Sequence, residues 1–175
     1  MMLNTSEETY ESVLKLRTVR RFLAKPVTEN DLTRILEAAR WTGSSKNRQS
    51  WSFVVVRERA QLDRLAECGD FTVPIRNAPL VIAPVRLPEG YEWDMGRVSQ
   101  NIMLAAAAIG VGSCPITLHR EDCAREALGI PGDHGCRYVV ALGYPDEPAE
   151  RAGRTASAMA GRKSLEDLVR YERFS

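Results

Sequence analysis

The sequence lacks a surplus of charge and any long apolar run. Its 24 basic and 23 acidic side chains give a formal net charge of +1. A broad nucleic-acid surface needs excess positive charge to displace counterions, so this balance argues against nucleic acid as a partner. A local anion site is still allowed, because a phosphate needs only a few donors. The longest uncharged apolar stretch, residues 102–109, is too short to span a bilayer.

Metal and disulfide chemistry have little support in the sequence. The chain has four cysteines, and no two of them form a Cys-x-x-Cys pair: Cys68, Cys114, Cys123 and Cys136. The two histidines do not stand at zinc-site spacing. We therefore predict no metal site, and reduced cysteines in or near the core. The polar, acidic N-terminus is unlike a signal peptide, so we expect a cytoplasmic protein.

Several common enzyme motifs are also absent. There is no Gly-x-Ser-x-Gly elbow and no His-Glu-x-x-His site. Gly110 and Gly112 do not complete a Rossmann fingerprint, because they follow a predicted helix rather than a strand. Residues 161–164 lack the upstream glycine of a phosphate-binding loop. No arrangement of paired carboxylates stands out either.

The length and the apolar periodicity fit one layered domain. A chain of 175 residues suggests a single domain. Thr28, followed by Asp31, resembles a capping box. Periodicity predicts helices over residues 6–15, from 28 onward, and over 61–67, 93–109, 120–128 and 164–171. Apolar runs predict strands over residues 51–56, 80–85 and 137–143. Strands separated by helices indicate an α+β fold.

The C-terminal part of the chain differs in composition from the rest. Residues 144–161 hold prolines, glycines and small residues without a core pattern, whereas residues 164–171 regain an apolar stripe. A segment of this kind often packs on another element, and a partner subunit is one candidate. We predict a single domain over residues 1–175, with 144–175 as an extension that packs on the partner subunit.

Four segments stand out as candidate ligand contacts. Two are basic: residues 17–20 offer guanidinium groups and a hydroxyl, and residues 162–163 offer two more cations. Residues 44–51 are rich in Ser, Asn and Gln, whose donors and acceptors can read the edge of a flat heterocycle. Residues 110–117 hold two glycines, which allow close backbone approach, and then an apolar surface. Each segment alone is also typical of a solvated charge cluster, a polar turn or a helix stop.

Together and in this order, these segments resemble the nitroreductase family of FMN enzymes. The resemblance runs from about Leu14 to the C-terminus. It rests on Arg-Thr-Val-Arg-Arg-Phe, Ser-Ser-Lys-Asn-Arg-Gln-Ser-Trp, residues 94–101, residues 110–116, Ala-Leu-Gly-Tyr-Pro and Gly-Arg-Lys. It implies a central, mainly antiparallel sheet flanked by helices. It also implies an intertwined homodimer that binds FMN at the dimer interface.

The resemblance further implies cofactor-binding roles for single residues. The phosphate, the ribityl chain and the pyrimidine ring would be held from one side by Arg17, Thr18, Val19 and Arg20. The phosphate grip would be completed by Arg162 and Lys163. The isoalloxazine would be reached from the other subunit by Ser45, Asn47 and Gln49. The ring would be lined by Pro115, Ile116 and Thr117.

The implied activity is hydride transfer from NADH or NADPH, through FMN, to a small acceptor such as a nitroaromatic or a quinone. The flavin carries this chemistry, so no catalytic side chain is assigned. Three alternatives remain open at this point. The protein could store or sense FMN without turnover, or it could be a flavin dehydrogenase of a biosynthetic intermediate. A plain dimerisation module would purify without flavin absorbance.

The departures from the family pattern concern the substrate more than the flavin. Ser50 stands where the family usually has proline, Leu16 where many members have arginine, and Thr117 where well-studied members have glutamate. Residues 69–93 form a short region that, in larger relatives, holds helices shaping the substrate channel. The physiological acceptor therefore does not follow from the sequence.

Overall fold

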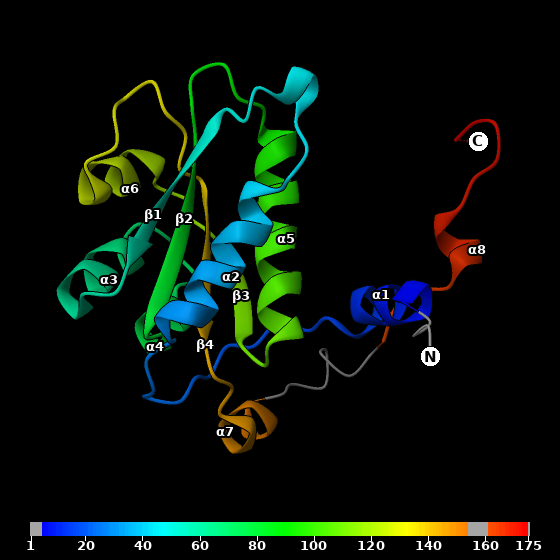
Figure 1. Cartoon of the computed structure of the whole chain (residues 1–175), viewed down its shortest axis with the longest axis horizontal. Helices are drawn as coiled ribbons and strands as arrows, with labels where there is room; N and C mark the ends of the chain where they lie inside the picture. The colour runs from blue at the N-terminus through cyan, green and yellow to red at the C-terminus, as the bar shows by residue number, and fades with distance from the viewer. Residues whose placement is uncertain (1–4, 154–160, 175) are drawn as a thin grey trace.

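The computed structural model describes residues 5–153 and 161–174. Four antiparallel strands form its centre in the order β1-β2-β4-β3. Their bounds are β1 Trp51–Val56, β2 Leu80–Arg86, β3 Gly112–Thr117 and β4 Tyr138–Gly143. Helices cover both faces of this sheet (Figure 1). The predicted α+β layered fold with an antiparallel sheet is confirmed.

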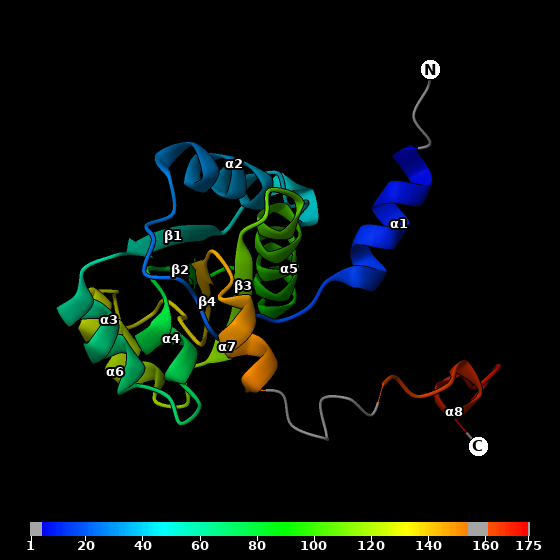
Figure 2. The ribbon, with the colours of Figure 1, turned by 90° about the horizontal axis from the view of Figure 1, so that it is seen from below.

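One face of the sheet is covered by α2 (Glu29–Arg40) and α5 (Glu92–Ala108) (Figure 2). The Oγ1 atom of Thr28 accepts the backbone N–H of Asp31 at 3.1 Å, which confirms the predicted cap of α2. α5 ends as predicted, with Gly110 in the left-handed region at φ +75. Both helices pack on the sheet through buried residues that include Leu32, Ile35, Ala39, Val98 and Ile102.

The opposite face is covered by α3 (Arg59–Ala66), α4 (Val73–Asn77) and α6 (Glu121–Leu128) (Figure 2). A second core lies beneath them and includes Leu62, Leu65, Ile75, Leu118 and Ala124. A disulfide joins Cys68, just after α3, to Cys123 in α6. The prediction that all cysteines are reduced is wrong for this pair, because the fold brings together two residues that are 55 positions apart. Cys114 and Cys136 are buried free thiols, as predicted.

Three predicted elements need correction. The helix stop at Gly110 is present, but the turn expected to follow it is wrong, since β3 begins at Gly112 and pairs along β4. β3 is an edge strand, which is where a proline such as Pro115 is tolerated. The short helix α4 has no counterpart among the predictions. The final helix is shorter than predicted, because only α8, Leu165–Leu168, is helical.

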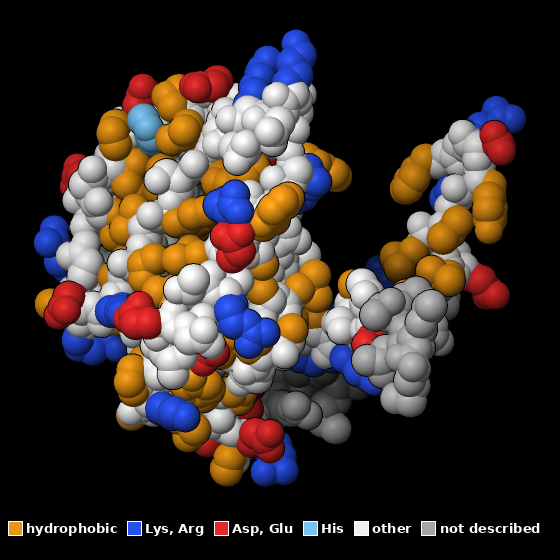
Figure 3. All heavy atoms as spheres, viewed as in Figure 1, with side chains coloured by type: hydrophobic (Ala, Val, Ile, Leu, Met, Phe, Trp, Pro, Cys, Tyr) orange, Lys and Arg blue, Asp and Glu red, His pale blue; other side chains and the backbone are white. Residues whose placement is uncertain are grey.

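The two ends of the chain stand away from the sheet. α1 (Thr5–Lys15) and α8 project from the body, whereas α7 (Glu147–Ala152) lies beside it (Figure 1, Figure 2). Apolar side chains on the projecting parts face solvent, as the space-filling view shows for the C-terminal segment (Figure 3). Examples are Val13 at 52% exposed and Leu165 at 77% exposed. None of the described helices is long and apolar enough to cross a membrane.

Candidate functional site

The first basic segment lies at one end of the sheet, in an extended stretch that follows α1. The backbone N–H of Val19 donates to the carbonyl of Ser113 at 2.8 Å, and Phe22 forms an isolated bridge with Pro145. Glycine at position 112 makes this close approach possible. A Cβ on Gly112 would stand 2.9 Å from the side chain of Val19. The stretch is therefore held against the start of β3.

The two basic ends of the chain meet in one cavity of about 280 Å³. Arg17 and Thr18 line it from the first segment, and Arg162 lines it from the C-terminal segment. The guanidinium of Arg17 donates to the carbonyl oxygens of Leu14 at 2.6 Å and Leu16 at 2.8 Å. Two guanidinium groups and a hydroxyl on one cavity form a donor set suited to a phosphate. Lys163 follows Arg162 but does not line this cavity.

A second cavity of about 550 Å³ adjoins the first, because Thr18 lines both. Arg20 lies on its wall, and in the described part of the chain the Arg20 guanidinium makes no hydrogen bond or ion pair. β3 supplies another wall through Pro115, Ile116 and Thr117. Along this strand Pro115 is exposed and Thr117 half-buried, whereas Ile116 is buried in the core. A flat ring lying on β3 would thus contact alternate residues.

Cys114 also lines the second cavity, but it is not suited to nucleophilic chemistry. Burial raises the pKa of its thiol to about 11. Since the thiolate is the reactive form of cysteine, this group stays protonated and unreactive near neutral pH. The cavity therefore offers a surface for a ligand, and the side chain of Cys114 offers no covalent step.

Glu150 in α7 is a residue that sequence reasoning missed. Its carboxylate accepts the backbone N–H groups of Arg20 and Arg21, the latter at 2.6 Å. Its helix is capped by Asp146, whose side chain accepts the N–H of Ala149 at 3.1 Å. Glu150 thus fixes the backbone from which the Arg20 side chain reaches the second cavity. A lone glutamate in a segment rich in small residues carries no sequence signal for this role.

The Ser45–Gln49 loop lies at the other end of the sheet. Trp51 begins β1 two residues after this loop, and β1 is one edge strand of the sheet, whereas the second cavity is walled by β3, the opposite edge strand, and the first lies near the start of β3. A single chain therefore does not bring Ser45, Asn47 and Gln49 to the cavities. The structure does bring residues of the other three predicted segments to the two adjoining cavities.

The backbone of this loop is unusual. Three of its non-glycine residues, Lys46, Asn47 and Gln49, have positive φ values of 52, 52 and 50. Such conformations cost about 1–3 kcal/mol each and persist only where other contacts fix them. Here the hydroxyl of Ser44 accepts the N–H of Gln49 at 2.9 Å, and the Gln49 amide donates to the Asn47 side chain at 3.2 Å. Strain of this kind is typical of functional loops.

Other residues of the second cavity come from a turn after α3 and from the residues that follow β3. They include the polar Asp70 and His119 and the apolar Phe71. None was predicted as a site residue, because their role depends on a contact between segments far apart in sequence. Within the described ranges, no group of three or more histidines, cysteines or carboxylates could hold a metal ion. The absence of a metal from the chemistry stays a prediction.

Comparison with known proteins identifies a family. The family model described as Nitroreductase family matches residues 13–69 and 71–144. A relative from Archaeoglobus fulgidus is provisionally named NADH dehydrogenase/NAD(P)H nitroreductase. It is 32% identical over 152 residues, which cover 81% of this chain and 87% of the relative.

Solved structures show the same fold. A provisionally named NADH dehydrogenase/NAD(P)H nitroreductase from Parabacteroides distasonis aligns with a TM-score of 0.82 at 22% identity, covering 95% of this chain and 99% of its own. An FMN-dependent nitroreductase from Clostridium difficile aligns with a TM-score of 0.77 at 26% identity. That alignment covers 93% of this chain and 98% of the other.

Proposed function

The chain belongs to the nitroreductase family, and on this basis we propose that it is an FMN-dependent oxidoreductase that passes hydride from NADH or NADPH to a small acceptor, such as a nitroaromatic or a quinone. Bound FMN would supply the hydride-carrying chemistry. The observation that carries the proposal is the shared cavity of Arg17 and Arg162, which adjoins the cavity walled by β3. A donor set suited to a phosphate thus lies next to a surface suited to a flat ring.

The residues of this chain would hold the cofactor in separate ways. Arg17, Thr18 and Arg162 bind the phosphate, with Lys163 adding positive charge nearby. Val19 contributes backbone to the same segment. Arg20, whose guanidinium makes no hydrogen bond or ion pair with the described residues, would lie toward the pyrimidine ring and stabilise negative charge there. The ring itself is lined by Pro115, Ile116 and Thr117.

The second half of the ring site would come from a partner subunit. Ser45, Asn47 and Gln49 precede the edge strand opposite β3 and line neither cavity of their own chain. We infer an intertwined homodimer in which these residues reach the ring held by the other chain. The exposed apolar side chains of α1 and α8 support this arrangement, because a monomer gains nothing by leaving them in water. The extension over residues 144–175 would then pack on the partner.

Steady-state kinetics test the proposed function. The FMN-loaded protein should oxidise NADH or NADPH at a rate that depends on an added nitroaromatic or quinone. Light scattering over a range of protein concentrations should give the mass of a dimer. Oxidation that does not depend on bound FMN would contradict the proposed function. A monomer at all concentrations would contradict the shared site.

A further inference from the structure

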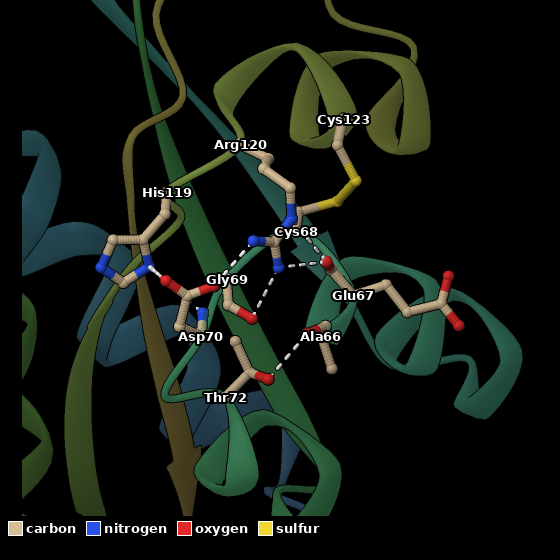
Figure 4. Close-up of polar contacts among 9 residues, drawn as sticks. All are labelled: Ala66, Glu67, Cys68, Gly69, Asp70, Thr72, His119, Arg120 and Cys123. Carbon is tan, nitrogen blue, oxygen red and sulfur yellow. Dashed lines mark hydrogen bonds and ion pairs between the residues drawn. A yellow bond between two sulfur atoms is a disulfide. The ribbon is translucent and has the colours of Figure 1, made fainter.

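His119 presents one ring nitrogen to the second cavity as a hydrogen-bond donor. Its Nδ1 atom accepts the backbone N–H of Asp70 at 3.2 Å. If the imidazole is neutral and Nδ1 accepts this hydrogen bond, the ring proton is on Nε2. If the ring is protonated and pairs with the Asp70 carboxylate, 3.6 Å from Nδ1, Nε2 also carries a proton, so Nε2 is a donor in both states. Nε2 points away from the Asp70 turn (Figure 4) and, across residues 5–153 and 161–174, has no hydrogen-bond partner. The side chain is 38% exposed, so a ligand can reach it.

The turn that orients His119 is held from several sides. The guanidinium of Arg120 donates to the carbonyl oxygens of Glu67 at 2.6 Å and Gly69 at 2.9 Å, and to the Asp70 carboxylate at 2.6 Å (Figure 4). The disulfide of Cys68 lies beside this contact (Figure 4). Such a supporting shell fixes the direction of the donor before a ligand arrives.

Close packing also ties this turn to β3. A Cβ on Gly69 would stand 2.7 Å from the side chain of Thr72 and 2.9 Å from the carbonyl oxygen of Thr117. Only glycine therefore allows the turn to lie against the end of β3. His119 follows that end by two residues, so its donor and the ring surface of β3 belong to one wall.

Phe71 adds an apolar surface beside the donor. Its ring is 80% exposed and lies edge-on to His119, with a centroid distance of 6.1 Å and an interplanar angle of 66°. An exposed phenyl ring on a cavity wall favours contact with another flat apolar group. The cavity thus offers an aromatic surface and a single directed donor next to it.

We propose that His119 and Phe71 form the acceptor-binding subsite, and that it selects flat aromatic compounds carrying a carbonyl or nitro oxygen. Phe71 packs on the aromatic ring, and the Nε2–H of His119 donates to the oxygen. This inference rests on the proposed function, because it names the residues that would bind the acceptor in that same cavity. Neither the family likeness nor the flavin-binding residues require it.

A matched pair of non-reacting probes tests the subsite. Acetophenone and ethylbenzene have nearly the same size, and only acetophenone has an oxygen acceptor. Their dissociation constants would be measured on the oxidised, FMN-loaded protein by the change in flavin absorbance, without nicotinamide. The wild type should bind acetophenone about fivefold to tenfold more tightly, the difference expected for one hydrogen bond.

Three variants distinguish the contributions of His119 and Phe71 to the binding of the probes. His119→Leu should abolish the preference for acetophenone, whereas His119→Gln should retain much of it, since the Gln amide places an N–H near the position of Nε2. Phe71→Ala should weaken both probes to a similar extent. Equal binding of the probes to the wild type, or an unchanged preference in His119→Leu, would overturn the inference. FMN content and bleaching by NADH or NADPH report on the proposed function separately.

Discussion

Arg17 and Arg162 line one cavity although they lie near opposite ends of the chain. The first follows α1 and the second precedes α8. Each residue alone is also typical of a solvated charge, whereas two guanidinium groups that converge on one cavity form a donor set suited to a phosphate. Thr18 connects this cavity to the one walled by β3, so a phosphate and a ring of one ligand can occupy both.

Removal of Arg17 should weaken FMN binding. Each charge-assisted hydrogen bond to a phosphate contributes about 1.5–3 kcal/mol, so Arg17→Ala should raise the dissociation constant about tenfold to a hundredfold. Fluorescence titration of the apoprotein with FMN measures the change. Arg64→Ala, an exposed arginine on α3 outside both cavities, is the matched control and should bind as the wild type does. An Arg17→Ala protein that stays fully yellow after dialysis would disprove the assignment.

Loss of the Glu150 carboxylate should loosen the segment that carries Arg20. Glu150→Ala removes the acceptor for two backbone N–H groups, which we expect to destabilise the fold by about 1–3 kcal/mol. Tm should fall by about 2–4 °C for each kcal/mol lost. Glu150→Gln keeps an acceptor oxygen and should lose less. Glu147→Ala, on the same helix and exposed, should have little effect, and an equal loss in both alanine variants would refute the role of Glu150.

How much of the fold could be predicted depends on which signals are local. The cap of α2 at Thr28 and the strands of the sheet centre follow from short patterns, and the structure has them. β3 was missed because its glycine, cysteine and proline residues do not resemble a strand. It forms because β4 offers an unpaired edge next to it. That is a tertiary effect, which a local pattern does not contain.

Some residues of the candidate site could likewise be predicted from local sequence patterns, and others could not. The basic segments could be found from residue type alone, since arginine clusters suit phosphates. The turn around Asp70 and His119 could not, because its role depends on Arg120 bridging two segments far apart in sequence. The disulfide of Cys68 and Cys123 could not be predicted either, because it also joins two segments far apart in sequence. The contact of the Ser45–Gln49 loop with the flavin ring of a partner subunit stays a prediction, because it involves two chains.

The disulfide should respond to reductant. Denatured, unreduced protein should show two free thiols, and reduction should raise the number to the four cysteines of the sequence. Cys68 and Cys123 are 55 positions apart, so reduction of their disulfide should lower the free energy of unfolding by about 4 kcal/mol in the chain-entropy account. A lower urea midpoint measures this loss. The double variant Cys68→Ser/Cys123→Ser should not respond to reductant.

The two free thiols should be unreactive in the native protein. Burial raises the pKa of Cys114 to about 11, and that of Cys136 to about 12, from an ordinary value of 9.0. The stability that these protonated thiols contribute is fully present below pH 9.0 and is lost as the pH rises through 11 and 12. Alkylation by iodoacetamide near neutral pH should be slow in buffer and fast in urea. Rapid labelling of folded protein would contradict this.

We propose above all that this chain passes hydride through bound FMN. Anaerobic titration of the FMN-loaded protein with NADH or NADPH, followed by visible absorbance, tests it most directly. We predict that the yellow colour bleaches with about one equivalent of nucleotide per flavin, and that a nitroaromatic or quinone then restores it. Tightly bound flavin that neither nucleotide bleaches would contradict the account and would favour storage or sensing of FMN.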